Sequence, residues 1–571
     1  MAFKLVPYGF TTFDRIRNDN VAFVDKTRFI EELERLNSPF PLFLRPRRFG
    51  KTVLTSMLFY YYDKALAGEF DKLFKGTYIY DHKTELQGKF YVLKFEFSGI
   101  DADNLVDGFI KKLRWGMRDF FKRYPHSGRD RFLESSYESP SGLWQDFCES
   151  VGSFVDQNLY VLIDEYDYFA NEVLANNKGL FEKITSSTGF LKNFYANLKD
   201  QASGGVISRI FITGVTSISL DSVTSGFNIQ KNISQLPIFA DAIGFTEVEL
   251  RKLICETVDV ERCGVTVDAL VERMKDYYNG YRFSPNSDAS VYNASMCLYF
   301  LDSYQSIYRE PYSLFDPAVG MDIGKVCKIL SAFDGKMLRD VVEAALEDRL
   351  IEFSQESLVQ SMNFNNPQLN GENALAILYF MGYLTHAKGR EDKLCCPNKA
   401  MRSRFFAYFF ITLTGGALQY NSNALKDAFD QLSKGSVESL LALVARTIRG
   451  KSGMHIHAHL SEAVFQMAFL FAMLTNSAYE TTLEEEARGS GYCDILLRPK
   501  TDAARLPAYL LEIKYLAKKN GTDLQVEREL EASLGQLRRY EGVEPLSNIP
   551  NLKKVAAVFV GTDVRRIEMM Q

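Results

Sequence analysis

Residues 41–52 read PLFLRPRRFGKT, an apolar segment followed by a basic loop that ends in Gly50, Lys51 and Thr52. The residues that follow read as a helix, so the loop connects a strand to a helix, as a phosphate-binding loop does. Gly50 would let the backbone approach a phosphate, Lys51 would reach the β- and γ-phosphates of ATP, and Thr52 would ligate Mg²⁺. We therefore expect the nucleotide to be bound by Arg48, Phe49, Gly50, Lys51 and Thr52.

One position departs from the usual pattern GxxxxGK[ST], because Arg45 stands where the first glycine is expected. Pro46 could set the turn instead, since its ring fixes its own φ angle. Arg47 and Arg48 could add positive charge near the phosphates. The alternative is a GKT triplet that stands at a helix start by chance.

A second segment, LYVLIDEYD at 159–167, reads as an apolar strand that ends in two acids. Asp164 would hold Mg²⁺, and Glu165 would polarise the water that attacks the γ-phosphate. A solvated acidic turn is the alternative. The strand SRIFIT (208–213) could present Thr213 or Ser217 to the γ-phosphate, although ordinary turn polarity explains these two residues equally well.

The chain changes character along its length. Strands expected at 39–45, 89–98, 159–164 and 208–213 are separated by helical stretches, which indicates a parallel α/β sheet. Residues 246–445 read as a helical lid and connector. This region starts with Thr246 and Glu249 at the spacing of a capping box and includes a helix that leads into a hairpin at 374–387. We predict three domains, with the bounds 1–245, 246–445 and 446–571.

The C-terminal part reads α-β-β-β-α-β, with KKVAAVFVG as its final strand. Asp494 lies in one strand candidate, and Glu512 and Lys514 lie two positions apart in the next, so the latter pair faces one side. These carboxylates, with Glu462 on the preceding helix, suit Mg²⁺ or Mn²⁺. Lys514 would orient a water molecule or stabilise charge on a phosphate. A solvated strand edge is the alternative. His455, His457 and His459 fit a polar helix start better than a metal site.

These residues resemble two families. PYG (7–9), VDKT (24–27), LRPRRFGKT, VLIDEYD, GFTEVEL (244–250) and YYNGYRF (277–283) are similar to the AAA-ATPase-like family over about residues 1–300. In that family the RPRRFGK form of the loop is typical. The resemblance implies an ATPase core of the ASCE type that uses Mg²⁺ and ATP. VDKT would cover the nucleotide base through Asp25 and Lys26, or would form only a turn. YYNGYRF would pack the lid on the core, which we favour over contact of Arg282 with nucleotide.

Residues 455–562 resemble the PD-(D/E)XK nuclease superfamily: a helix with Glu462, a strand with Asp494, the E-x-K pair and a helix with Gln536 near Tyr540. Many relatives carry G-R-x-D, whereas this chain reads Gly-Tyr-Cys-Asp at 491–494. The arginine is missing, which puts substrate contact in doubt. The resemblance implies a C-terminal α/β fold of the restriction-endonuclease type.

Composition bounds the remaining questions. The chain has 571 residues, of which 46% are apolar and 24% charged, and a net charge of −5, so nucleic acid would have to be bound by local basic patches. Eight scattered cysteines without a CxxC pair indicate reduced thiols and a cytoplasmic protein. No secretion signal or apolar run of membrane-spanning length occurs, so no membrane partner is expected.

Together these patterns predict an ATP-dependent or ATP-regulated, Mg²⁺-dependent nuclease that acts on nucleic acid, DNA rather than RNA, in defence or mobile-element biology. The alternative is a nucleotide-switched signalling or scaffold NTPase whose nuclease-like domain binds nucleic acid or protein without cutting. A homo-oligomer is compatible with the sequence, since a neighbouring subunit often completes AAA-type sites.

Overall fold

The computed structural model describes residues 3–18, 20–100, 104–125, 136–176, 178–185, 189–217, 229–311, 314–316, 341, 344–345, 349–355, 371–402, 420–449, 462–473, 476, 478–487, 491–499, 505–543 and 546–570. The chain divides into two compact units, Met1–Arg402 and Ser403–Gln571, which are described separately. The division into three domains at 245 and 445 stays a prediction. None of the described helices is both long and apolar enough to cross a membrane.

The first unit is built on a five-stranded sheet in which every pairing is parallel. Its strands, in spatial order, are β2 (Tyr91–Glu96), β3 (Leu159–Asp164), β4 (Ile207–Gly214), β1 (Pro41–Leu44) and β5 (Lys231–Asn232). Every residue of β1 and β3 is buried, as expected for strands covered on both faces. The four predicted strands are confirmed, and β4 lies between the two that carry the expected nucleotide motifs. That strand order is the one the ASCE resemblance implies.

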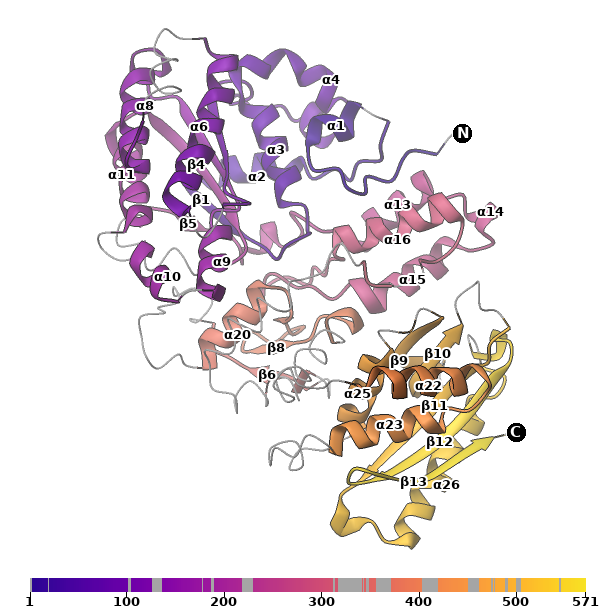
Figure 1. Cartoon of the computed structure of the whole chain (residues 1–571). Coiled ribbons are helices and arrows are strands. Elements are labelled where there is room, and N and C mark those ends of the chain that lie inside the picture. The colour runs from indigo at the N-terminus through magenta and orange to yellow at the C-terminus, as the bar shows by residue number, and fades with distance from the viewer. Residues whose placement is uncertain are drawn as a thin grey trace. The chain divides into compact units, whose positions relative to one another are not determined.

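Helices cover both faces of this sheet (Figure 1). Helix α3 (Lys51–Tyr62) packs on one face, against β2, β3 and β4. On the other face, α6 (Leu105–Arg123) packs against β2 and α11 (Phe190–Gly204) packs against β4. Helix α8 (Pro140–Val155) contacts both α6 and α11. The shorter elements are α1 (Phe13–Asn18), α2 (Arg28–Arg35), η1 (Lys64–Glu69), α4 (Phe70–Phe74), α5 (Tyr78–Asp81), α9 (Tyr168–Asn176), α10 (Lys178–Thr185) and η3 (Pro237–Phe239).

A helical region follows within the same unit. It contains α13 (Glu247–Thr257), α14 (Val260–Cys263), α15 (Val267–Tyr278) and α16 (Ala294–Ile307). The predicted capping box is confirmed: the Thr246 side chain accepts from the Glu249 N–H, and the Glu249 carboxylate accepts from the Thr246 N–H. The expected helix and hairpin are also confirmed as α20 (Gly371–Phe380), β7 (Thr385–His386) and β8 (Lys393–Cys395). Strand β8 also pairs with β6 (Ile351–Glu352), which gives the order β6-β8-β7.

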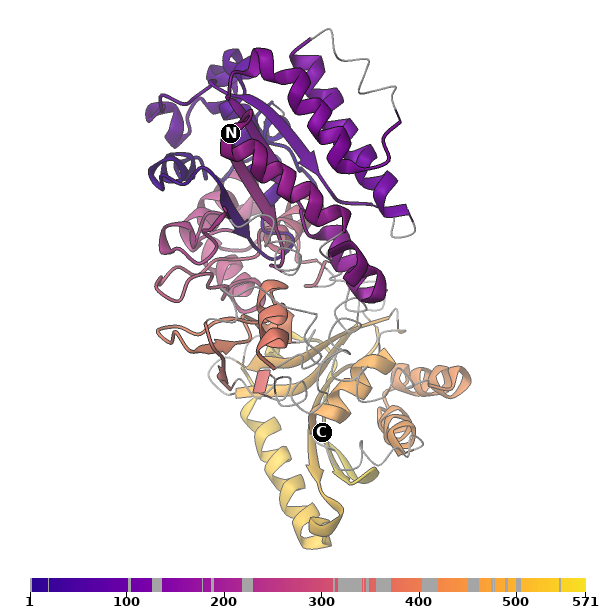
Figure 2. The same cartoon turned by 90° about the vertical axis from the view of Figure 1, so that its left-hand side faces the viewer.

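The second unit holds a mixed sheet in the order β13-β12-β11-β10-β9, in which only the β11–β12 pairing is parallel. Its strands are β9 (Tyr479–Ala487), β10 (Gly491–Pro499), β11 (Ala508–Leu516), β12 (Leu552–Val560) and β13 (Asp563–Met570). Its helices are α22 (Ser422–Ser433), α23 (Glu438–Arg449), α25 (Glu462–Met473) and α26 (Asp523–Arg539), with the short turns η6 (Lys518–Asn520) and η7 (Leu546–Asn548). The apolar side of α26 packs along β10, β11 and β12 (Figure 2).

One expectation needs correction, because KKVAAVFVG is not the last strand. After β12 the chain turns back and adds β13 to the edge of the sheet in antiparallel pairing. None of the residues of β13 is fully buried, and its sequence, DVRRIEMM, mixes charged with apolar residues. An edge strand of this kind lacks the apolar run that marks the buried strands.

Candidate functional site

The phosphate-binding loop is tied to the sheet at both ends. The Arg45 N–H donates to the Gly214 carbonyl of β4, and α3 begins at Lys51. Gly50 precedes the helix with a φ of 106°, a conformation that a residue with a Cβ rarely adopts. The Lys51 side chain is 3% exposed; its ammonium donates to the Arg45 and Pro46 carbonyls, each at 3.1 Å, and lies 3.7 Å from a Glu165 oxygen. The lysine is thus held at the loop.

Asp164 and Glu165 follow the end of β3 beside this lysine. Both side-chain oxygens of Asp164 are buried, and in the described part of the chain neither has a hydrogen-bond partner of normal geometry. Burial and the Glu165 charge raise the pKa of Asp164 to about 6, although Lys51, Lys94 and the nearby Thr52 hydroxyl act in the opposite direction. Glu165 has a φ of 54°, which turns the chain sharply at the strand end. The predicted set Lys51, Thr52, Asp164 and Glu165 is therefore brought together.

Thr213 lies on β4 between the two motifs. Its carbonyl accepts from the Tyr166 N–H at 3.2 Å, and its buried hydroxyl has no hydrogen-bond partner among the described residues. The Ser217 hydroxyl is likewise buried without a partner in that part of the chain. Both hydroxyls are thus available to a ligand at this edge of the sheet.

Arg45, at the position of the missing glycine, is a core residue. It is 1% exposed, and its guanidinium donates to the carbonyls of Leu44, Ser234 and Phe239 at 2.6–2.8 Å. It also lies 4.4 Å from the ring centroids of Phe43 and Phe283. Burial lowers the pKa of Arg45 to about 10, so the group stays charged at neutral pH. The arginine joins β1 to the segment after β5, a role the sequence analysis missed.

The other loop arginines lie further out. Arg47 lies over the Tyr168 ring, 5.1 Å from its centroid. Arg48 is exposed and has a φ of 72°, and its carbonyl accepts from the Ser295 N–H of α16. Phe49 is buried edge-on against Tyr281 and Phe283, with centroid distances of 4.7 and 5.3 Å. The YYNGYRF segment therefore packs against the phosphate-binding loop, as favoured above.

Asp167, the second aspartate of DEYD, was not singled out from sequence. It is fully buried and accepts from the Val215 N–H at 3.0 Å and from the Thr216 N–H and hydroxyl at 2.7 and 2.8 Å. Asn171 donates to the same carboxylate at 2.8 Å. These bonds join the turn after β3 to the turn after β4. The signal in the sequence was a third acid, three positions after the end of an apolar strand.

The VDKT segment connects the N-terminal part to the helical region. Lys26 donates to the Asp241 carbonyl at 2.8 Å and to Glu249 at 2.7 Å, the residue that closes the capping box of α13. Burial lowers the pKa of Lys26, and the Glu249 charge opposes this shift. Asp25 accepts from the N–H groups of Thr27 and Tyr78. Both predicted anchor residues thus make structural contacts.

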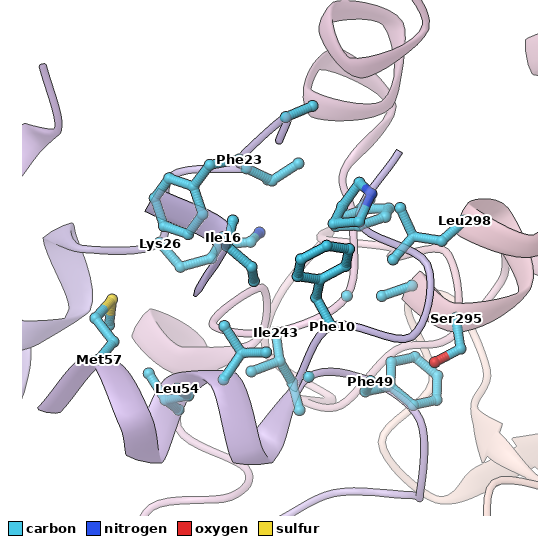
Figure 3. Close-up of a pocket in the computed structure, with 18 of the residues that line it drawn as sticks. Phe10, Ile16, Phe23, Lys26, Phe49, Leu54, Met57, Ile243, Ser295 and Leu298 are labelled. Carbon is cyan, nitrogen blue, oxygen red and sulfur yellow. The ribbon is translucent and has the colours of Figure 1, made fainter. Parts of the chain in front are cut away.

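An apolar cavity of about 130 Å³ lies beside the loop (Figure 3). Phe10 and Phe23 come from the N-terminal segment, Val53 from the start of α3, Ile243 from the segment before α13 and Leu298 from α16. Gly50 lines the same cavity, so the phosphate-binding loop and the apolar space are continuous. A flat aromatic group attached to phosphates would find both chemistries side by side.

The second unit brings the other predicted residues together. Register places Asp494 of β10 opposite Glu512 of β11, one step beyond the pair Ile495–Leu511. Asp494 accepts from Gln466 on α25 at 3.0 Å and from the Ile513 N–H at 2.5 Å. Glu512 is 0% exposed, and neither of its carboxylate oxygens has a hydrogen-bond partner of normal geometry among the described residues. Burial, and the mutual repulsion of the two carboxylates, raise the pKa of Glu512 well above its usual range.

Lys514 completes this cluster. Its ammonium lies 3.4 Å from a Glu462 oxygen at the start of α25. Burial lowers the pKa of Lys514, but Asp494, Glu462 and Glu512 more than offset this effect, so the pKa is raised overall. On α26, Gln536 donates to the Tyr540 hydroxyl at 2.7 Å. Burial raises the pKa of Tyr540, and the nearby Glu512 charge adds to this shift.

The described residues contain no group of three or more His, Cys, Asp or Glu side chains spaced to hold a metal ion as they stand. The donor chemistry nevertheless fits a hard cation, since the buried carboxylates of Asp164 and Glu512 have no hydrogen-bond partner of normal geometry among the described residues. His455, His457 and His459 lie outside the described residues. Gln466, which holds Asp494, was missed because a glutamine in an apolar helix gives no recognisable motif.

Comparisons with known proteins agree with this division of the chain. A family described as predicted AAA-ATPase matches residues 7–224, and the PD-(D/E)XK nuclease superfamily matches residues 460–569. No curated protein and no solved structure matches the chain. Residues 7–224 thus form an AAA-ATPase-like domain, and residues 460–569 form a domain of the PD-(D/E)XK nuclease superfamily.

Proposed function

We propose that this protein is an ATP-dependent or ATP-regulated, Mg²⁺-dependent nuclease. The observation that carries the proposal is the cluster of Asp494, Glu512 and Lys514, drawn from neighbouring strands, in which the Glu512 carboxylate is buried beside Asp494 and has no hydrogen-bond partner of normal geometry among the described residues. A carboxylate left this way in a protein interior is costly. A divalent cation would compensate that cost, which is why we read the cluster as a metal site and not as a structural one.

Asp494, Glu512 and Glu462 would hold Mg²⁺ or Mn²⁺. Such a cation polarises a phosphate and lowers the pKa of bound water. Lys514 lies beside the carboxylates, where its ammonium would orient the attacking water or stabilise charge on the phosphate. Tyr540, whose hydroxyl accepts from Gln536, would help to fix the position of Glu512.

In the ATPase-like domain, Lys51 would exchange its bonds to the loop carbonyls for the β- and γ-phosphates. Thr52 and Asp164 would hold Mg²⁺, and Glu165, turned toward Lys51, would orient the attacking water. The apolar cavity next to Gly50 would receive the nucleotide base. Because helix α16 lines that cavity, nucleotide binding would involve the helical region and transmit the nucleotide state.

One observation favours the alternative, a nucleotide-switched signalling or scaffold NTPase that does not cut. Glu512 is fully buried, and both oxygens of Asp494 already accept hydrogen bonds. These bonds occupy part of the acceptor capacity of the Asp494 oxygens that a metal ion would use. The missing arginine before Asp494 points in the same direction, since it removes one expected contact to substrate.

The wider biology is proposed on analogy. The pairing of an ATPase-like with a nuclease-like domain suits defence against foreign DNA or mobile-element biology, with DNA as the preferred nucleic acid. A cytoplasmic location fits the described cysteines, none of which forms a disulfide. A homo-oligomer would supply the arginine that AAA-type sites often receive from a neighbouring subunit.

The test mixes purified protein with linear, circular and single-stranded DNA and with RNA. Each substrate is incubated with Mg²⁺ or Mn²⁺, with and without ATP. We expect metal-dependent cutting that Glu512→Gln abolishes and that responds to ATP. If nothing is cut under any condition, or if Glu512→Gln cuts like the wild type, the nuclease proposal is wrong and the alternative takes its place.

A further inference from the structure

Helix α6 carries an unusual combination on its outer face. Trp115 is 67% exposed, whereas the other tryptophan, Trp144, is fully buried. Lys111, Arg118 and Lys122 are exposed on the same helix. The positions 111, 115, 118 and 122 follow the i, i+4, i+7, i+11 spacing of one helical face. We call Lys111, Lys112, Trp115, Arg118 and Lys122 the α6 stripe.

The charge of this helix contrasts with that of the chain. Six lysines and arginines and two aspartates give α6 a formal charge of +4, within a protein of net charge −5. One of the two aspartates, Asp119, is engaged by Arg123, which also binds Asp63. No cation of the α6 stripe forms an ion pair with a carboxylate in the described part of the chain. Their positive charge is therefore available to a partner.

One cation of the stripe lies close to the indole. The Lys112 ammonium lies 5.7 Å from the Trp115 ring centroid. The inward face of α6 is already used, since Phe109, Leu113, Met117 and Phe120 are buried against the sheet and α8. The helix thus presents outward the exposed Trp115 ring, with Lys112 beside it and further cations along the same face.

We propose that the α6 stripe binds single-stranded nucleic acid, with Trp115 stacking on a base and the cations contacting phosphates. The aromatic face accepts any base, because every base has a flat π surface, and the phosphates pair with the lysines and the arginine. A protein partner fits less well, since protein interfaces are depleted in lysine around their aromatic centre. A base within a duplex is already stacked on both faces, so the exposed indole favours unpaired strands.

This inference rests on the proposed function, which requires nucleic acid as a partner. It adds a place on the ATPase-like domain where the strand is held, apart from the candidate nucleotide and metal sites. The stripe is long enough to contact several phosphates. With a rise of about 1.5 Å per residue, Lys111 and Lys122 lie about 16 Å apart along the helix axis.

The experiment uses the full chain in EDTA, so that no cutting occurs, and titrates oligodeoxythymidylate and oligouridylate. Trp115 is the exposed one of two tryptophans, so its fluorescence should be quenched in a saturable way, and Trp115→Phe should remove that quenching. Trp115→Ala should weaken binding of a dye-labelled oligonucleotide roughly tenfold. Arg118→Ser should reduce the slope of log affinity against log salt by about 0.7, as expected for one lost phosphate contact on a single strand.

Lys252→Ser serves as a matched control, because Lys252 is a 74% exposed lysine on α13. It should leave both affinity and salt slope unchanged. Unchanged affinity in Trp115→Ala, or equal loss for duplex and single strand, would overturn the proposal. If Trp115→Ala instead abolished self-association in sedimentation, the stripe would bind protein and the proposal would be wrong. If the wild type shows quenching but cuts no substrate, the nuclease proposal is wrong and the proposal for the α6 stripe is supported. If it cuts but shows no quenching, the proposal for the α6 stripe is wrong and the nuclease proposal is supported.

Discussion

The phosphate-binding site and the C-terminal carboxylate cluster both place carboxylates around one lysine, but they do so at different depths of a sheet. Asp164 and Glu165 stand at the end of β3, and Lys51 is held by carbonyls of an adjoining loop. Glu512 and Asp494 stand within their strands, and Lys514 lies beside a carboxylate on a helix. The first site thus lies at a strand end beside a loop, whereas the second lies within its strands beside side chains of α25 and α26.

The largest expected effects come from replacing Lys51 and Lys514, each of which should impair a different activity. Lys51→Ala should lower ATP turnover by at least about 100-fold, because it removes the cation that would contact the phosphates in the transition state. Lys514→Ala should leave ATP turnover unchanged and lower DNA cutting to a similar degree. Release of ADP and cleavage of DNA are measured for both variants in parallel.

DNA cleavage by the Lys51→Ala variant shows whether the nuclease activity depends on ATP turnover. Loss of cutting means that ATP drives or licenses the nuclease, and retained cutting means that the two activities are independent. Wild-type ATP turnover in Lys51→Ala would contradict the reading of this loop. Lost ATP turnover in Lys514→Ala would contradict the separation of the sites.

A second prediction concerns stability in the phosphate-binding loop. Arg45→Gly would restore the usual glycine, yet we expect it to lower the free energy of unfolding by about 3 kcal/mol. Three backbone carbonyls would lose their donor, and the space between Phe43 and Phe283 would empty. The melting transition of the variant is compared with that of the wild type.

Arg48→Gly is the control, since Arg48 is exposed with a φ of 72°, where glycine is unstrained. Its melting temperature should be unchanged or slightly raised. A stable Arg45→Gly protein would mean that the arginine is kept for contact with nucleotide and not for packing.

The contrast also explains what could be read from sequence. Gly50, Lys51 and Thr52 stand at the start of α3 and the DE pair stands at the end of β3, where each side chain's role follows from its position in a short motif. The partners of Arg45 could not be predicted, because Ser234 and Phe239 lie about 190 residues away. The Lys26–Glu249 contact spans 223 positions and depends on the packing of the helical region.

In the second unit, the spacing of Glu512 and Lys514 predicted a shared face, and the β10–β11 register adds Asp494. The depth of the cluster could not be predicted, because burial of Glu512 depends on α26 packing over the sheet. Strand β13 was missed for a related reason: an edge strand with charged residues lacks the periodic apolar signal of a buried one.

Opposite pH dependence offers a third comparison of the two units. In the first unit, His386 lies beside the rings of Tyr379 and Phe353, and burial lowers its pKa to about 4. Between pH 6.5 and about 4, His386 is therefore protonated in the unfolded chain but neutral in the folded chain. Stability should fall as the pH is lowered through that window, by about 3 kcal/mol at full effect.

His386→Phe should remove this loss, because the ring keeps its packing and no longer titrates. Chemical denaturation of both proteins at several pH values gives the difference directly. Subtracting the two curves cancels other titrating groups, among them Asp164, whose raised pKa acts in the opposite direction. Parallel curves would mean that His386 is solvated in solution.

The pH dependence of Glu512 gives the most informative prediction for the carboxylate cluster. Burial raises the pKa of Glu512, so its contribution to stability is present below its ordinary value and is lost as the pH rises from about 4.5 upward. Glu512→Gln has the same shape without a charge. At low pH it should melt like the wild type, and at higher pH it should melt at a higher temperature.

Magnesium should reverse that order, because a cation bound to Asp494 and Glu512 would stabilise only the wild type. The variant would then be the more stable protein without metal, the less stable one with metal, and unable to cut DNA. A structural carboxylate would give a different pattern, in which Glu512→Gln is destabilised at every pH and Mg²⁺ changes nothing. The crossing of the two stability curves therefore separates a metal site that costs stability from a core contact that provides it.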